Sequence, residues 1–283
     1  MHPSAVAALR CPHSADQLHL DDRTLVCDAG HRFDLARQGY VNLVAGGGTR
    51  HSGDDVAMLD RRERVLSAGL LDPVLDALAD GVADALSTAP TDGPRVLVDI
   101  GAGPGWHLAQ LVGDHPDRCG IALDVSKQAA RRAARAHPRV VSVVADAWSG
   151  LPIGDAAADV AIVAFAPRNG AELARILPPH GRLLVAVPAD DHLASLRDRL
   201  GLLAVDPDKA DRVDAQLRPH LEVLDDRPVR WERPLTPSEA ADLVGMGPSA
   251  HHLDIEGLAQ DLARDAAPPH LDGAVRLLTL ARR

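Results

Sequence analysis

Short apolar runs alternate with helical patterns through the middle of this 283-residue chain, and this alternation limits its fold more than any other feature. We expect strands at residues 96–100, 120–125, 140–144, 160–165 and 182–187, and helices at 106–112, 127–136 and 171–177. Strands that alternate with helices pair in parallel, and the helices cover both faces of the sheet. The sequence therefore predicts an α/β fold with a mostly parallel sheet.

The flanking segments extend this prediction. Residues 54–88 have the apolar spacing of two helices and follow a glycine-rich linker at 46–53. Further along, we expect helices at 192–202, 237–244 (capped by Thr236) and 258–265, and strands at 221–231 and 273–281. The last two strands would complete a seven-stranded sheet with an antiparallel pair at its edge. The chain then divides into a small module at 1–45, a linker with helices at 46–90 and the main domain at 91–283.

Composition excludes several classes of protein. The net charge of −10 argues against a non-specific nucleic-acid binder, because such proteins need an excess of cations. The longest apolar run, at 160–166, is far shorter than the ~20 residues of a membrane span, and the N-terminus does not resemble a signal peptide. Three cysteines, an odd number, argue against a disulfide framework. We therefore expect a cytoplasmic protein without a membrane partner.

A glycine-rich turn follows the first strand of the main domain. Asp99 lies near the end of that strand, and Gly101, Gly103 and Gly105 lead into the next helix. Glycines let the backbone turn sharply and approach a ligand closely, at the sheet edge where ligands bind. Taken alone, this spacing fits a nucleotide, flavin or S-adenosylmethionine site, with Asp99 orienting the loop or meeting an amino group.

Acidic residues also follow the next two strands. Asp124 is placed to accept hydrogen bonds from ribose hydroxyls, and Asp146 from the adenine amino group, with Ala147 or Trp148 near the ring. A dehydrogenase would usually show Gly-x-Gly-x-x-Gly instead. Three acids at successive strand ends look like the class I S-adenosylmethionine-dependent methyltransferase pattern.

The acceptor side of the site is less clear from the residues. Phe165, at the end of the fourth strand, is a candidate to stack on a flat base, although simple core packing explains it equally well. Pro167 and its neighbours are candidates to hold the base. His107, just after the glycine loop, is a candidate for cofactor binding or proton transfer, and a helix-surface role competes with both.

The N-terminal module contains part of a zinc-ribbon ligand set. Cys11, Cys27 and His31 supply three ligands, but Ser14 stands where a fourth is expected. His13 is the first choice as a substitute and His19 the second; the alternative is a module that folds without zinc. Five arginines are candidates to contact phosphate groups: Arg10, Arg32, Arg37, Arg50 and Arg168.

These residues together resemble the RlmA/TlrB family of 23S rRNA guanine-N1 methyltransferases. The most specific stretch runs from Phe33 to Leu43, and shorter ones are Arg10-Cys-Pro-His, Phe165-Ala-Pro-Arg-Asn169 and Met246-Gly-Pro-Ser249. The resemblance implies a class I, Rossmann-like methyltransferase that uses S-adenosylmethionine, with a zinc-ribbon-like module that recognises RNA. It also implies a target guanine in a 23S rRNA hairpin near the macrolide-binding tunnel, a contribution to tylosin-type macrolide resistance, and a capacity to form homodimers.

Two other functions compete with this one. A small-molecule methyltransferase of secondary metabolism would have the same cofactor site and would suit the acidic surface better, but it leaves the segment from Cys11 to Leu43 unexplained. A non-catalytic RNA- or ribosome-binding protein is disfavoured by the intact glycine loop and Asp124. Ser14, and the absence of an aromatic residue after Ser249, depart from the family pattern.

Overall fold

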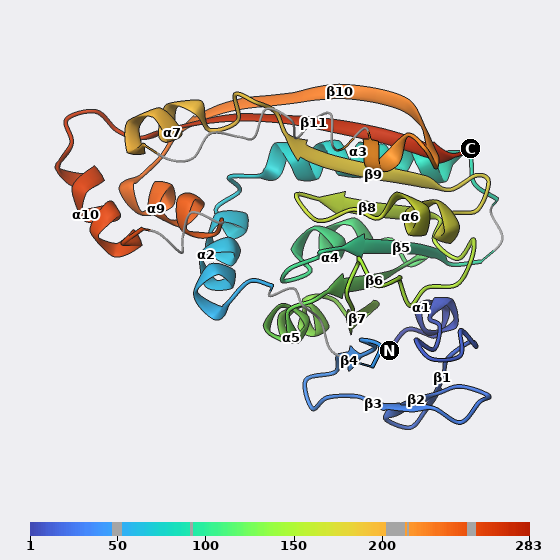
Figure 1. Cartoon of the computed structure of the whole chain (residues 1–283). Helices are drawn as coiled ribbons and strands as arrows, with labels where there is room; N and C mark the ends of the chain where they lie inside the picture. The colour runs from blue at the N-terminus through green and yellow to red at the C-terminus, as the bar shows by residue number, and fades with distance from the viewer. Residues whose placement is uncertain (47–52, 91–92, 202–212, 214, 248–252) are drawn as a thin grey trace.

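One mostly parallel sheet runs through the molecule. The computed structural model describes residues 1–46, 53–90, 93–201, 213, 215–247 and 253–283. Within these residues the sheet has eight strands in the order β10-β11-β9-β8-β5-β6-β7-β4, and β1-β2-β3 form a separate small sheet (Figure 1). Strands β4 to β9 pair in parallel, whereas β11 runs antiparallel to both β9 and β10. The predicted fold class and its late antiparallel pair are confirmed.

The central strands are buried on both faces. All six residues of β5 are buried, as expected of a parallel strand covered on both sides. The strands of the main sheet are β4 (Val41–Asn42), β5 (Arg95–Ile100), β6 (Arg118–Asp124), β7 (Val140–Val144), β8 (Val160–Ala164), β9 (Arg182–Pro188), β10 (Leu221–Pro234) and β11 (His270–Arg282). Those of the small sheet are β1 (His19–Asp21), β2 (Thr24–Val26) and β3 (Arg32–Asp34).

Helices cover the two faces of the sheet. Apolar side chains of α1 (Pro3–Ala8) and α6 (Gly170–Ile176) share one core with the strands. Those of α3 (Asp72–Ser87), α4 (Trp106–Val112) and α5 (Lys127–Ala136) form the core on the other face. The very short α1 was not predicted, because six residues are too few to show a helical period.

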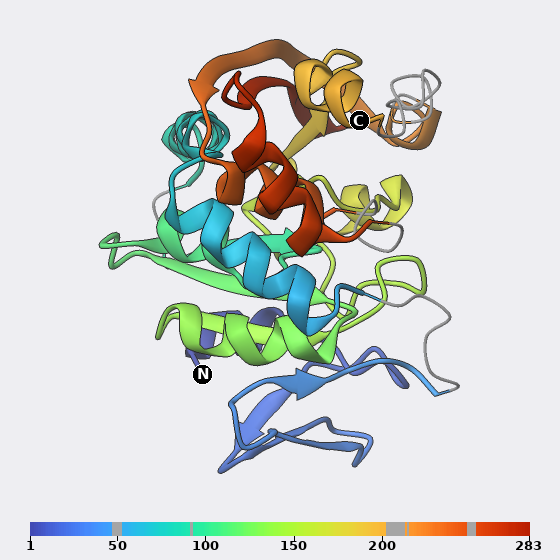
Figure 2. The same ribbon diagram turned by 90° about the vertical axis from the view of Figure 1, so that its left-hand side faces the viewer.

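Four more helices gather at the end of the sheet where the parallel strands finish. They are α2 (Val56–Ser67), α7 (Ala194–Leu200), α9 (Pro237–Gly245) and α10 (Ile255–Arg264), and all four contribute to a third apolar cluster. Figure 2 looks onto this end, with α2 crossing in front of the strand ends. This arrangement brings segments that are far apart in the chain to the edge where a ligand of an open α/β sheet is expected.

Side-chain caps set where several of these helices begin. Asp55 accepts from the backbone N–H of Met58 at the start of α2, and Ser126 accepts from Ala129 at the start of α5. Thr236 and Glu239 form a reciprocal capping box on α9, which confirms the cap predicted there.

Several elements differ in detail from the expectation. The eighth strand, β4, comes from the N-terminal segment and pairs with β7 through only two residues. Strand β8 ends at Ala164 rather than Phe165, because Phe165 has a left-handed backbone with φ of 57°. Helix α7 begins at Ala194 rather than residue 192. No helix in the described ranges is long and apolar enough to cross a membrane.

Candidate functional site

The glycine turn after β5 needs its glycines. Gly101, Gly103 and Gly105 all have positive φ, at 72°, 55° and 78°. A Cβ atom on Gly101 would lie 2.4 Å from the Cβ of Ala166, and one on Gly105 would lie 2.9 Å from that of Ala133. The loop therefore packs its backbone directly against α5 and against the segment that follows β8.

Asp124 connects this turn to the end of β6. Its Oδ2 accepts from the backbone N–H of Gly103 at 2.8 Å, and its Oδ1 accepts from Ser126 at 2.8 Å. Burial raises the pKa of Asp124, and these two hydrogen bonds act in the opposite direction. The carboxylate is thus held rigidly at the mouth of the glycine turn.

Asp99 lies behind the turn and is 2% exposed. Burial first, and then the charge of Asp124, raise its pKa to about 7. Two carboxyl groups so close together favour a cationic ligand, because a positive charge would stabilise both in their ionised forms.

A cavity of about 290 Å³ opens at the ends of the four central parallel strands. Seven of the predicted site residues line it: Gly101, Asp124, Asp146, Ala147, Trp148, Phe165 and Pro167. Asp99, Gly103, Gly105 and His107 are not among the lining residues and lie behind or beside them. The backbone N–H of Trp148 donates to Asp146 Oδ1 at 3.0 Å, so the loop after β7 is held against the cavity.

Sequence reasoning missed the other wall of this cavity. Gly53, Asp54 and Arg62 line it from α2 and the residues before that helix. Arg62 forms an ion pair with Asp54 at 2.8 Å and donates to the carbonyl of Met246 at 3.1 Å. No local motif marks Arg62, because its role depends on α2 folding back over strands that begin more than thirty residues later.

His107 lies on the first turn of α4. Burial, and then the charge of Arg62, lower its pKa to about 4, so the imidazole is neutral at pH 7. Its Nε2 is buried and has no hydrogen-bond partner within the described part of the chain. The prediction that His107 contacts the cofactor or the transferred proton stays a prediction.

The predicted metal ligands come together. Cys11 Sγ and Cys27 Sγ lie 3.5 and 3.3 Å from His31 Nδ1, and the three ligand atoms lie within 4.8 Å of one another. Burial opposes ionisation of Cys27, but contacts with Ser14, His31 and Cys11 lower its pKa to about 6. Two thiols and an imidazole at these distances form a donor set that fits zinc.

Ser14 occupies the side of this cluster where a fourth ligand would stand. Its Oγ lies 3.6 Å from Cys27 Sγ. The ring of His13 instead packs against His31 and Phe33, with centroids 5.0 and 5.9 Å away. The structure does not bring His13 or His19 into the group of close ligand atoms.

Comparison with known proteins identifies the family. The model of the RlmA N-terminal zinc-ribbon family matches residues 9–45. A 23S rRNA (guanine(748)-N(1))-methyltransferase of Streptomyces fradiae is 45% identical, with 93% of this chain and 92% of that protein aligned. A Micromonospora griseorubida protein named for the same reaction, without a nucleotide position, is 47% identical over 98% of both chains. This chain belongs to the 23S rRNA (guanine-N1) methyltransferase family.

A more distant member supports the same assignment. YxjB of Bacillus subtilis, also named for this reaction, is 33% identical, with 68% of each chain aligned. The family resemblance expected from the sequence is confirmed, and so is the methyltransferase activity. Membership favours an rRNA methyltransferase over the small-molecule and non-catalytic alternatives.

The arginines expected to contact RNA have different surroundings. Arg10 donates from Nη1 to the carbonyls of Ala7 and Leu9, both at 2.9 Å. Arg32 pairs with Asp21 at the exposed surface, and Arg168 donates to Gln216 Oε1 at 3.4 Å. Arg37 is exposed, and within the described residues no acid pairs with it. Arg50 lies outside the described residues.

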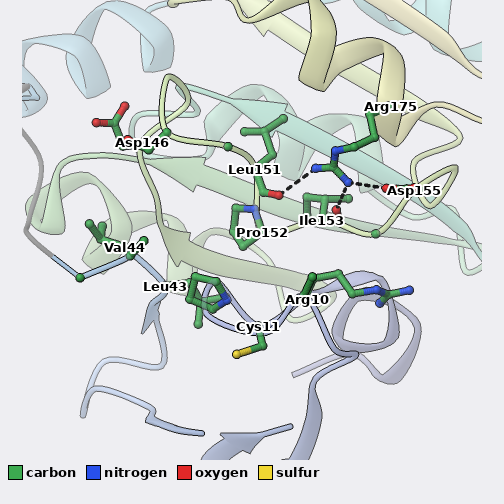
Figure 3. A pocket seen from close by; sticks show the side chains of 17 residues that line it. Arg10, Cys11, Leu43, Val44, Asp146, Leu151, Pro152, Ile153, Asp155 and Arg175 are labelled. Atoms are coloured by element: carbon green, nitrogen blue, oxygen red, sulfur yellow. Dashed lines mark hydrogen bonds and ion pairs between the residues drawn. The ribbon is translucent and has the colours of Figure 1, made fainter. Parts of the chain in front are cut away.

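A second cavity, of about 790 Å³, separates the family's N-terminal segment from the loop after β7 (Figure 3). Arg175 fastens that loop by donating to the carbonyls of Leu151 and Ile153 and to Asp155. Asp146 and Leu151 line both cavities. The larger cavity therefore adjoins the smaller one at this loop.

Proposed function

We propose that this protein transfers a methyl group from S-adenosylmethionine to N1 of a guanine in 23S rRNA. The observation that carries the proposal is the cavity at the ends of β5 to β8, which joins the glycine turn after β5 to Asp124 and Asp146 at the ends of β6 and β7. The names of the relatives supply the acceptor, and that of the Streptomyces fradiae relative specifies guanine 748.

Each predicted cofactor residue has a distinct task in this proposal. The turn at Gly101, Gly103 and Gly105 admits the methionine part of the cofactor, and Asp99 balances its ammonium charge. Asp124 accepts from the ribose hydroxyls. Asp146, with Ala147, accepts from the adenine amino group. The burial of Asp99 beside Asp124 supports this assignment, because a cation relieves the repulsion between the two acids.

The reaction depends mainly on alignment. When bound, S-adenosylmethionine supplies an electrophilic methyl group on a sulfonium. Guanine N1 must lose its proton, and its electron pair then forms the new N–C bond while the C–S bond electrons stay on sulfur. The wall of Phe165 and Pro167 holds the base, and this positioning supplies much of the rate. His107, whose buried Nε2 has no hydrogen-bond partner among the described residues, remains the candidate for proton transfer.

The N-terminal module is proposed to recognise the RNA. Cys11, Cys27 and His31 would hold a structural zinc ion, supported by the close approach of their ligand atoms. Arg10, Arg32, Arg37, Arg50 and Arg168 supply the phosphate contacts. The division into residues 1–45, 46–90 and 91–283, a homodimer, cytoplasmic location and a contribution to macrolide resistance complete the proposal.

A methyl-transfer assay tests it. The purified protein is incubated with radiolabelled S-adenosylmethionine and a 23S rRNA hairpin that contains guanine 748, and the product is digested to nucleosides. We expect label in 1-methylguanosine, and none when adenine replaces that guanine. An active cofactor site with no label in RNA would favour the small-molecule alternative. No cofactor binding at all would favour the non-catalytic one.

A further inference from the structure

Aromatic side chains are scarce in this chain, and their exposure is uneven. Of the six Phe, Tyr and Trp residues, only Trp148 and Phe165 are exposed, at 45% and 41%. Both line the cavity at the strand ends. An exposed aromatic ring beside a ligand cavity presents a flat face on which a planar ligand can stack.

Phe165 faces a second ring that the family motifs do not include. His192 follows β9, and its imidazole lies 6.3 Å from the Phe165 ring, with the two planes inclined by only 26°. Stacked bases are spaced about 3.4 Å apart, so a base between two rings needs roughly 7 Å. The two ring planes are inclined by 26° and their centroids lie slightly closer than this spacing, so a base would enter after a small widening of the gap.

Both rings are carried by constrained backbone. Phe165 has a left-handed φ of 57°, and its N–H donates to the carbonyl of Ala186 at 3.0 Å. Leu193, next to His192, is also left-handed at 57°, and its N–H donates to the carbonyl of Asp272 at 2.9 Å. Left-handed conformations are costly for such side chains and gather at functional sites.

A hydrogen bond fixes the imidazole itself. The backbone N–H of Ala274 donates to His192 Nδ1 at 3.1 Å, which places the ring proton of the neutral form on Nε2. Trp231 packs against the imidazole with centroids 6.2 Å apart. Neutral His192 therefore has no nitrogen lone pair available as a base, and its flat face is what it offers to a substrate.

We propose that Phe165 and His192 form a slot that receives the target guanine and stacks on both of its faces. The proposal rests on the function proposed above and adds His192 as a positioning residue for that substrate. The slot would hold the base at the end of β8, beside the cavity assigned to the cofactor. A nucleotide turned out of its RNA stack would regain there the stacking that it lost.

Two substitutions of His192 distinguish the contribution of its ring from that of its hydrogen bond. His192→Asn keeps an acceptor for the N–H of Ala274 but removes the ring, whereas His192→Phe keeps a ring and removes the acceptor. We expect His192→Asn to raise KM for the hairpin RNA roughly tenfold or more, the size of one lost base-stacking contact. His192→Phe should stay within about threefold of wild type, and the cofactor Kd should stay unchanged in both.

Hairpin RNA with 2-aminopurine in place of the target guanine reports the stacking directly. Binding of wild-type protein and His192→Phe should quench its fluorescence relative to the unstacked base, whereas His192→Asn should not. Leu224→Ala, an exposed apolar side chain on β10, is the control and should behave as wild type. Thermal melting and cofactor binding verify that each variant is folded.

The outcomes distinguish the slot from the function on which it rests. If wild-type protein does not methylate the hairpin, the proposed function fails. If it does, but His192→Asn keeps the wild-type KM and quenching, the slot is overturned. It is equally overturned if folded His192→Phe is as impaired as His192→Asn. Should His192→Asn not fold, Phe165→Leu supplies the same comparison from the other side of the slot.

Discussion

Asp99 illustrates how one buried carboxyl group can make the stability of the folded protein depend on pH. Its pKa is raised to about 7 in the folded protein, because burial and Asp124 disfavour its charge. The folded state therefore holds this proton more tightly than the unfolded state, whose carboxyl titrates near pH 4. The stabilising effect is complete below about pH 4 and is lost as the pH rises through about 7.

We predict that Asp99→Asn removes this part of the pH dependence. The Tm of wild-type protein without cofactor should fall between pH 5 and pH 8 by several degrees more than that of Asp99→Asn. Thermal melts across this range, with Asp114→Asn as a surface control, measure the difference. Parallel curves of Tm against pH for wild type and Asp99→Asn would show that folding does not raise the pKa of this carboxyl group.

Ser14 determines how tightly the N-terminal cluster should bind metal. Ser14→Cys would add a thiolate beside Cys27 and complete four protein ligands, since the Ser14 Oγ already lies 3.6 Å from Cys27 Sγ. We expect zinc affinity, measured by competition with a chromophoric chelator, to rise by more than the roughly 10–100-fold typical of outer-shell changes. His13→Ala is the matched control. A loss of zinc in His13→Ala would instead make His13 the fourth ligand, as the sequence suggested.

At the scale of elements, the turn between β5 and α4 depends on close packing against the end of β8. We predict that Gly101→Ala destabilises the protein by about 1–3 kcal/mol and weakens cofactor binding, because its Cβ would meet Ala166 at 2.4 Å. Gly93→Ala has a similar positive φ and no atom within 4 Å, so it controls for backbone strain alone. Equal effects of the two substitutions on unfolding and cofactor affinity would contradict the role given to this contact.

Strand β3 and the turn after it carry two of the arginines that we assign to RNA binding, Arg32 and Arg37. Replacing Arg32 and Arg37 together by Ala should weaken hairpin binding and reduce the slope of log K against log salt by about one unit per lost contact. The control pair is Arg131 and Arg135 on α5. If the control pair changes the slope and the first pair does not, α5 rather than the N-terminal module contacts the phosphates.

Local sequence patterns predicted most of the helices and strands, but not the side of the site formed by segments outside the central strands. The strands around Asp99, Asp124 and Asp146 could be predicted because apolar periodicity and strand-end acids are short-range signals. Arg62 and His192 could not, because each reaches the site through packing between segments far apart in the chain. The left-handed Phe165 was also missed, since nothing in Phe165-Ala-Pro-Arg168 specifies its φ.

At the scale of the whole molecule, the N-terminal segment and the methyltransferase sheet are physically connected. Buried side chains of α1 and of Cys11 and Cys27 belong to the same core as β5 to β9, and β4 extends the main sheet. The larger cavity lies along this junction and meets the smaller one at Asp146 and Leu151. RNA held by the module would therefore be presented to the strand ends in a restricted orientation.

The central claim is that this protein methylates N1 of a guanine in 23S rRNA through the cavity at the strand ends. Mass spectrometric mapping of the hairpin in 23S rRNA tests it most directly, using cells with the gene, without it, and complemented with Asp124→Ala. We predict one 1-methylguanine in rRNA from cells with the gene and none in rRNA from cells without it. In cells complemented with Asp124→Ala, the modification should be lost or strongly reduced. An identical modification pattern in cells with and without the gene would contradict the claim.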